Sequence, residues 1–472
     1  MPTQAPPARG VSTPLPSTSL PGPRARALLE RGHHDMQSIY RSVIFDAERS
    51  LGTTLVDVDG NGFLDLFSSF ALGALGYNHP ALLQVARSDA FVRAAVNPTS
   101  TPFLTSPEWL DFADEVERDW APAGMSRIFC VDSGGEGVDS AIKAAFIKHG
   151  EARRVAEGLP ADPLQLPPSQ ADAWMANQGT DAVVISFDGA FHGRGLGPLS
   201  ATHSKLIHKA DLPAFPWPVA PFPAQRWPLE QHQEENERAE QQAITTLIEL
   251  LEQHAGRVAA VLVEPVQSEG GDRHAAASFF RKVRALTAEA GAALILDEVQ
   301  TGTGISGSLW CHSQFDLPAP PDLVTFGKKM QLGGFFAAPS HDIRQFGRMY
   351  QTRNGDRARA MLALATLRAL RDLDLLRNVR ETGALFLQEL QALERAHPRL
   401  ISQARGRGFL LAFDLPTPAA RDELLKRCLQ RGVFASYTGS RSVRLRPHLV
   451  TTPAEVTEAM AVFHAVAREL DI

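Results

Sequence analysis

Two short apolar runs, each ending in charged side chains, constrain the fold of this chain more than any other feature. Residues 292–296 lead directly into Asp297, and residues 323–326 are followed by a glycine and the pair Lys328 and Lys329. A buried strand of a parallel sheet has this pattern, with polar groups at its carboxyl end. Ligand sites in open α/β sheets lie just beyond those ends. The two segments therefore predict an α/β fold with a carboxylate and an amine at one edge of its sheet.

A carboxylate and a lysine at neighbouring strand ends suit pyridoxal phosphate. This cofactor needs an acid at its ring nitrogen and an amine for its aldehyde. The spacing alone does not choose between Lys328 and Lys329. The alternative is the acidic strand end of a nucleotide hydrolase, which requires a Gly-x-x-x-x-Gly-Lys-Ser/Thr loop to hold the phosphates. The sequence contains no such loop, so the cofactor site is the stronger hypothesis.

A glycine-rich turn before a helix is a candidate phosphate site. Residues 127–131 predict a strand, and Gly134 and Gly135 follow it at the start of an amphipathic helical segment. Backbone N–H groups at the positive end of a helix dipole bind phosphate readily. Such turns are common on their own. Together with Asp297 and the lysine pair, this one predicts a cradle for the cofactor phosphate.

A second loop with site-type residues follows the predicted strand at 182–187. It contains Phe191, His192 and Arg194 between glycines. An aromatic ring can stack on a flat cofactor, and an arginine can bind a carboxylate through two parallel hydrogen bonds. The alternative is a turn with an exposed arginine. We expect the loop to contribute to both the cofactor and the substrate parts of the site.

The chain length of 472 residues allows two domains and a large core. Changes in composition and pattern along the chain suggest where the divisions lie. We expect a Pro-rich N-terminal arm at 1–23, the first part of a small domain at 24–72, a large cofactor-binding domain at 73–345 and the rest of the small domain at 346–472.

Composition excludes several classes of function. The net charge of −6 gives no reason to expect binding to nucleic acid or to an anionic membrane. No apolar run approaches the roughly 18 residues of a membrane-spanning helix. Cys130, Cys311 and Cys428 are far apart and form no CxxC pair. This pattern favours a reducing compartment, taken here as the cytoplasm, and argues against a cysteine-bound metal.

Motifs along most of the chain carry a family resemblance. In order between residues 56 and 447 they are VDVDGN, GYNHP, GAFHGR, VEPVQSEGGD, LDEVQTG, FGKKM, RGRG and VRLRP. The chain resembles fold-type I, class III pyridoxal-phosphate aminotransferases, closest to the 4-aminobutyrate enzymes of animals and fungi, with lysine 6-aminotransferases next. The resemblance implies a large domain with a mainly parallel seven-stranded sheet between helices, and a smaller α+β domain built from both termini. It also implies a homodimer.

The resemblance assigns roles at the cofactor. It matches Lys329 to the Schiff-base lysine, Asp297 to the partner of the ring nitrogen and Gln300 to the partner of the ring hydroxyl. The remaining cofactor residues that it implies are the stacking Phe191 with its neighbour His192, the phosphate turn Gly134 and Gly135, and Thr352, a phosphate ligand supplied by the second subunit.

The resemblance also assigns the substrate residues and the reaction. Arg194 matches the arginine that holds the carboxylate of an ω-amino acid. Glu269 and Arg444 match a pair that opens when 2-oxoglutarate arrives with its second carboxylate, and Phe70 lies in the substrate-lining stretch. The implied activity is ping-pong transfer of an ω-amino group to 2-oxoglutarate. The alternatives are lysine ε-transamination and, from another class, a cofactor-binding protein without turnover.

The chain departs from the 4-aminobutyrate pattern in three respects. Gly135 replaces a serine of the phosphate turn. Ser133 and Glu136 occupy positions where animal enzymes carry iron–sulfur cysteines, so no such cluster is expected. The stretch 67–73 leans towards the lysine enzymes. It offers no acid for the second ammonium of lysine around Phe70, however, and a desolvated, unpaired charge costs several kcal/mol. We therefore expect 4-aminobutyrate to be the better donor.

Overall fold

A computed structural model describes residues 20–31, 43–99, 101–176 and 178–471. Most of the expected N-terminal arm, 1–19, lies outside these described residues. Within them, no helix is both long enough and apolar enough to cross a membrane.

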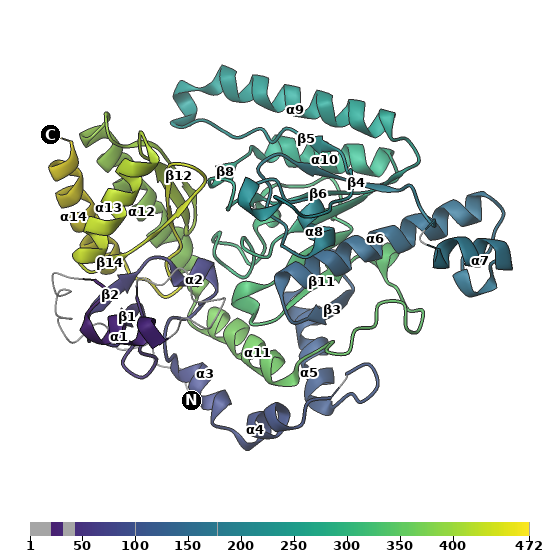
Figure 1. The fold of residues 1–472 in the computed structure, drawn as a ribbon, viewed down its shortest axis with the longest axis horizontal. Helices are drawn as coiled ribbons and strands as arrows, with labels where there is room; N and C mark the ends of the chain where they lie inside the picture. The colour runs from purple at the N-terminus through teal and green to yellow at the C-terminus, as the bar shows by residue number, and fades with distance from the viewer. Residues whose placement is uncertain (1–19, 32–42, 100, 177, 472) are drawn as a thin grey trace.

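A seven-stranded sheet forms the centre of the larger unit (Figure 1). Its strand order is β3-β11-β10-β9-β6-β4-β5. β11 runs antiparallel to both of its neighbours, whereas the other pairs are parallel. The prediction of a mainly parallel seven-stranded sheet is confirmed. The strands are β3 (Arg127–Val131), β4 (Val183–Phe187), β5 (Val219–Ala220), β6 (Val258–Val263), β9 (Ala293–Asp297), β10 (Leu323–Phe326) and β11 (Gly333–Ala337).

Helices cover both faces of this sheet, which explains its continuous apolar strands. Along β6, Val261 and Val263 belong to one buried cluster, while Ala260 and Leu262 belong to another on the opposite face. The second cluster includes α6 (Gly134–Ala156). The first includes α5 (Pro107–Glu115), α9 (Gln233–Gln253), α10 (Ala277–Glu289) and α11 (Arg357–Asp372).

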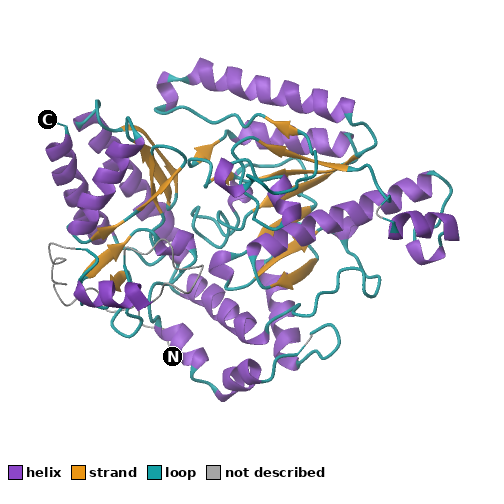
Figure 2. Ribbon diagram, in the orientation of Figure 1, coloured by secondary structure: helices purple, strands orange, loops and turns teal. Residues whose placement is uncertain are grey.

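A smaller unit combines both ends of the chain, as predicted (Figure 2). Strand β2 (Gly62–Asp65) pairs with β1 (Thr54–Val56) on one side and with β14 (Val433–Phe434) on the other. A four-stranded sheet adds β12 (Ser402–Arg407), β13 (Leu410–Asp414), β16 (Ser442–Leu445) and β15 (Ser436–Thr438). Helices α12 (Leu375–Ala396), α13 (Pro418–Gln430) and α14 (Pro453–Leu470) close its core.

Helix α11 joins the core of the larger unit, although the sequence-based division placed it in the smaller one. Its residues Ala360, Ala363 and Leu367 pack in the same cluster as β6 and α10. This packing favours a boundary after α11. The remaining elements are α1 (Pro23–Arg31), α2 (Ser68–Ala71), α3 (Pro80–Ala86), α4 (Asp89–Val96), α7 (Pro168–Met175), α8 (Leu196–Ser200), β7 (Val266–Gln267) and β8 (Arg273–His274).

A core substitution tests the packing on the α10 face. Phe279 is fully buried, with its ring centre 5.5 Å from that of Phe187 and 5.2 Å from that of Phe280. Phe279→Ala should lower the free energy of unfolding by about 3–5 kcal/mol because it leaves a cavity. Leu164→Ala, at a residue that is 85% exposed, should change it by less than about 0.5 kcal/mol. Denaturant unfolding measures both, and equal losses would contradict this description of the core.

Candidate active site

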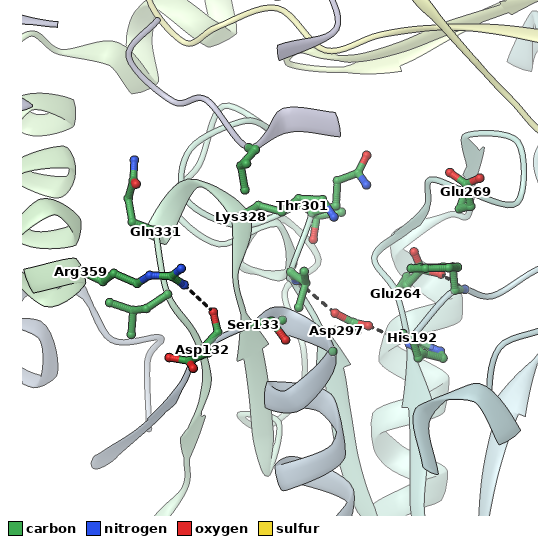
Figure 3. Close-up of a pocket in the computed structure, with 18 of the residues that line it drawn as sticks. Asp132, Ser133, His192, Glu264, Glu269, Asp297, Thr301, Lys328, Gln331 and Arg359 are labelled. Carbon is green, nitrogen blue, oxygen red and sulfur yellow. Dashed lines mark hydrogen bonds and ion pairs between the residues drawn. The ribbon is translucent and has the colours of Figure 1, made fainter. Parts of the chain in front are cut away.

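A cavity of about 440 Å³ lies beyond the carboxyl ends of β6, β9 and β10 (Figure 3). The larger unit provides most of its wall, and Leu72 closes it from the smaller unit. Seven residues predicted from the sequence line it: Gly134, Gly135, Phe191, His192, Glu269, Asp297 and Gln300.

Asp297, the last residue of β9, is held in one orientation by three contacts. The register of β9 and β10 places Thr325 opposite it, and the Thr325 hydroxyl donates to Asp297 Oδ1 over 3.0 Å. The backbone N–H of Val299 donates to the same oxygen over 3.1 Å. His192 Nδ1 lies 2.8 Å from Oδ2. An aspartate oxygen at this distance requires a proton on Nδ1, so His192 orients the carboxylate.

The structure places Lys328, not Lys329, on the cavity wall. Both belong to one 3₁₀ turn, Lys328–Met330, directly after β10. Successive side chains of such a turn point about 120° apart, so the two lysines face different surroundings. Lys329 is 1% exposed, and its Nζ donates to the backbone oxygen of Gln300 over 2.9 Å. The direction of the two side chains therefore favours Lys328 over Lys329, the lysine chosen from the sequence, as the reactive lysine.

The surroundings of Lys328 lower the pKa of its side chain. Burial is the main cause, whereas the nearby carboxylate of Asp297 opposes the shift and the Arg444 guanidinium adds to it. A lowered pKa increases the share of the free amine, which bond formation with an aldehyde requires. Burial lowers the pKa of Lys329 further still, so the position of Lys328 on the cavity wall, and not its pKa, distinguishes the two lysines.

The start of α6, where the sequence predicts a phosphate cradle, lies on the cavity wall. Ser133 caps the helix, and its side chain and that of Glu136 bond reciprocally to each other's backbone N–H. A Cβ on Gly134 would lie 2.4 Å from the Val299 side chain, so any other residue here would require Val299 to shift. At Gly135 the nearest atom would lie 3.8 Å away. The second position is therefore open enough for the serine that the family often carries there.

Glu264 is a cavity residue that the sequence analysis did not select. It follows the last residue of β6, is 6% exposed and accepts a hydrogen bond of 2.8 Å from the backbone N–H of Phe191. Burial and repulsion from Asp297 raise the pKa of its carboxyl well above the usual range. Glu264 stands at the end of a predicted strand, as Asp297 does, and that position could have identified it from the sequence as a candidate site residue.

Glu269 bridges two cations beside the cavity. Its Oε1 accepts from Lys205 Nζ over 2.5 Å, and its Oε2 accepts from Arg444 Nη1 over 3.0 Å. The ring of Phe70 lies 5.0 Å from the Arg444 guanidinium. The structure thus brings together the predicted Glu269, Arg444 and Phe70, and it adds Lys205, which the sequence analysis missed.

Phe70 lies in a left-handed turn. The four residues of α2, Ser68–Ala71, all have positive φ, from 40° to 64°. Such a conformation costs roughly 1–2 kcal/mol per residue. The turn is held by Asp65, which accepts from the backbone N–H groups of Phe67 and Ser68 at 2.8 and 2.9 Å. The strained segment places Phe70 against Arg444 and leads into Leu72 on the cavity wall.

Two further predicted site residues, like Lys329, Arg444 and Phe70, lie off this cavity wall. Arg194 is exposed and donates to His208 Nε2 over 3.2 Å, with its guanidinium 5.9 Å from the centre of the Phe191 ring. Thr352 lines a separate cavity of about 280 Å³ with Arg353 and Arg357. A single chain therefore does not bring Thr352 to the first cavity.

In the part of the chain that the structure describes, no group of three or more His, Cys, Asp or Glu side chains is arranged to hold a metal ion. Cys130, Cys311 and Cys428 are each buried and unpaired.

Comparisons with known proteins agree with this geometry. The family model described as "Aminotransferase class-III" matches residues 36–467. The 4-aminobutyrate aminotransferase of Dictyostelium discoideum is 36% identical over 97% of this chain and 92% of its own length. The mitochondrial enzyme of that name from Mus musculus is 35% identical over 96% and 90%. The structure of the lysine aminotransferase of M. tuberculosis is 30% identical, covers 95% of this chain and 99% of its own, and has a TM-score of 0.84.

The raised pKa of Glu264 has a consequence for stability. Above the ordinary glutamate pKa of about 4.3, the folded protein keeps a proton that the unfolded chain releases, so the free energy of unfolding falls as pH rises towards the folded-state pKa. Glu264→Gln removes the titrating group, and with it this fall in the free energy of unfolding, but it retains an acceptor for the backbone N–H of Phe191. In cofactor-free protein, its unfolding free energy should therefore decline less than the parent's between about pH 5 and pH 8.

Denaturant unfolding across this pH range measures the difference. Glu249→Gln, at an exposed position of α9, is the matched control and should follow the parent. Parallel curves for Glu264→Gln and the parent would contradict the assignment of a buried, protonated Glu264.

Proposed function

This chain belongs to the class III aminotransferases, which are pyridoxal-phosphate-dependent transaminases, and from that premise we propose that it transfers the terminal amino group of an ω-amino acid to 2-oxoglutarate. The proposed donor is 4-aminobutyrate, and the products are succinate semialdehyde and glutamate. The observation that carries the proposal is the Glu269–Arg444 pair beside the cavity. It offers a guanidinium that can be masked for one substrate and exposed for the other.

The cavity residues fit the cofactor. Gly134 leaves the start of α6 open to a phosphate, Asp297 presents a carboxylate to a ring nitrogen, and Lys328 presents an amine. Phe191 and Val299 both line the space between them and supply apolar contacts for a flat ring. Pyridoxal phosphate, when bound, supplies an electron-accepting ring and a carrier for the amino group.

The proposed roles follow from these positions. Lys328 Nζ would hold the cofactor and, as a free amine, would take a proton from the substrate carbon that carries the reacting nitrogen. Asp297 would lie against the ring nitrogen and favour its protonated form, because a nearby carboxylate favours a positive charge. His192 and Thr325 hold that carboxylate in place.

The substrate end of the site favours a donor with one ammonium group. The Arg194 guanidinium lies 5.9 Å from the centre of the Phe191 ring, and Phe191 lines the cavity, so a carboxylate bound by Arg194 would lie beside the cavity. Glu269 is already neutralised by Lys205 and Arg444. Glu264 is held towards its protonated form. Neither acid is free to pair with the second ammonium of lysine, and an unpaired buried charge is costly.

Lysine ε-transamination is the second candidate. The similarity to the lysine aminotransferase of M. tuberculosis favours it, and so does the stretch 67–73. A binding protein without turnover is disfavoured, because Lys328 and Asp297 both line the cavity.

We also propose a homodimer in which Thr352 reaches the partner's cavity. The support is that Thr352 lies on a separate cavity within its own chain. The buried, unpaired cysteines agree with the proposed cytoplasmic location.

Substitution of the two lysines tests the choice between them. Lys328→Ala should abolish the visible absorbance of lysine-bound cofactor and lower kcat by about 10²–10⁴-fold, since it removes both the covalent attachment and the proton carrier. Lys329→Met should retain the absorbance. Absorbance spectra of the reconstituted proteins and steady-state rates give the answer. Loss of the absorbance in Lys329→Met alone would return the role to Lys329.

The donor assignment is tested by two arginine substitutions. The parent should show a higher kcat/KM for 4-aminobutyrate than for lysine. Arg194→Lys should raise the KM for 4-aminobutyrate about tenfold, because a lysine cannot make the two-pronged contact. Arg444→Lys is the matched variant and should raise the KM for 2-oxoglutarate while sparing 4-aminobutyrate. A higher kcat/KM for lysine would overturn the donor and leave the aminotransferase assignment in place.

A further inference from the structure

Gln300 is held at both ends by buried basic side chains. Its backbone oxygen accepts from Lys329 Nζ over 2.9 Å, and its side-chain Oε1 accepts from Arg446 Nε over 2.9 Å. Lys329 is 1% exposed, and Arg446 is fully buried. Gln300 itself lines the cavity, which neither basic residue does. Lys329 and Arg446 therefore lie behind a side chain that faces the cofactor space.

The contact with Arg446 determines which way the Gln300 amide points. A guanidinium only donates hydrogen bonds, so the amide atom facing it must be the oxygen. The NH₂ group then points away from Arg446. Among the described residues, no acceptor lies within hydrogen-bond distance of it. The side chain thus offers two N–H donors to whatever occupies this part of the cavity.

Arg446 is fixed from several sides. Its guanidinium pairs with the fully buried Asp272 and donates to Ser268 Oγ over 3.3 Å. Its backbone N–H donates to Leu66 O over 2.6 Å. Asp272 belongs to the turn between β7 and β8 of the larger unit, while Arg446 follows β16 of the smaller one. These contacts fix the position of the Arg446 guanidinium, and with it the hydrogen bond to the Gln300 side chain.

We propose that Lys329 and Arg446 are positioning residues that fix the Gln300 amide as a donor to the ring-hydroxyl oxygen of bound pyridoxal phosphate. This inference rests on the proposed function, which places the cofactor in this cavity. Neither residue touches the cofactor. Arg446 adds positive charge behind the donor, and positive charge stabilises the anionic form of a nearby oxygen, while Lys329 holds the backbone of Gln300 in place through its hydrogen bond to the carbonyl oxygen. The second lysine of the pair therefore has a use that differs from that of Lys328.

A double-mutant cycle tests the positioning role. Arg446→Lys keeps a cation for Asp272 but removes the Nε donor that orients Gln300. In the parent background it should weaken pyridoxal phosphate binding to the cofactor-free protein about tenfold, a coupling within the range seen for contacting residues. It should also raise the pH midpoint of the absorbance change of the bound cofactor. In a Gln300→Ala background, the same substitution should weaken binding by less than about twofold.

Lys329→Met should likewise weaken pyridoxal phosphate binding and raise the absorbance midpoint in the parent background. In the Gln300→Ala background it should have little effect on binding. Arg405→Lys is the matched control, because Arg405 is another buried arginine of the smaller unit that donates to Gly271 O and Asp272 O but makes no contact with Gln300. It should leave the absorbance midpoint unchanged. Thermal unfolding of the cofactor-free variants separates loss of folding from loss of positioning.

The proposal would be overturned if Arg446→Lys weakened pyridoxal phosphate binding equally in both backgrounds. It would also be overturned if Gln300→Ala bound pyridoxal phosphate with the parent's affinity and showed the parent's absorbance midpoint. In either case, loss of the lysine-bound absorbance in Lys328→Ala would still support the proposed function. Retention of that absorbance in Lys328→Ala would instead remove the premise on which both proposals stand.

Discussion

The parallel pairing of β9 with β10 is the constraint on which the site depends. It sets Thr325 opposite Asp297 and ends both strands at the same edge of the sheet. The carboxylate is therefore delivered by one strand end, and Lys328 by the turn that follows the other. A shift of this register by one residue would point the Asp297 side chain towards the other face of the sheet, which is covered by helices. Helices pack on both faces, and burying an unpaired carboxylate there is costly, which makes the register strongly specified.

Charge pairing between the two units completes the site. Arg405, Arg444 and Arg446 reach from the smaller unit to the turn at 268–272 of the larger one, where they meet backbone oxygens and the carboxylates of Glu269 and Asp272. Buried ion pairs gain little net stability, but they penalise any arrangement that leaves one partner alone. The same contacts that align the units thus place Arg444 at the substrate end and Arg446 behind Gln300. We infer that the geometry of the cofactor site and the position of the smaller unit are coupled.

Three carboxyl groups in the cavity have different surroundings. Asp297 receives hydrogen bonds from a hydroxyl and a backbone N–H and lies against His192, so its orientation is fixed. Glu264 lies close by, but burial and the charge of Asp297 favour its neutral form. Glu269 meets two cations, which lower the pKa of its carboxyl against the opposing effect of burial. Three carboxyl groups of one cavity can therefore serve three different purposes.

The sequence by itself determined the class of fold, the cofactor and the elements that present the site. Strand-end polarity and a glycine turn are local patterns, and local patterns are sufficient to predict Asp297, the cradle at Gly134 and the stacking loop at Phe191. Only the tertiary structure distinguished Lys328, on the cavity wall, from Lys329 behind it, because the direction of a side chain in a 3₁₀ turn depends on what packs around it. It also revealed Glu264, Lys205 and Arg446. Their partners lie far away in the chain, so their roles arise from contacts between strands and between units that no local spacing encodes.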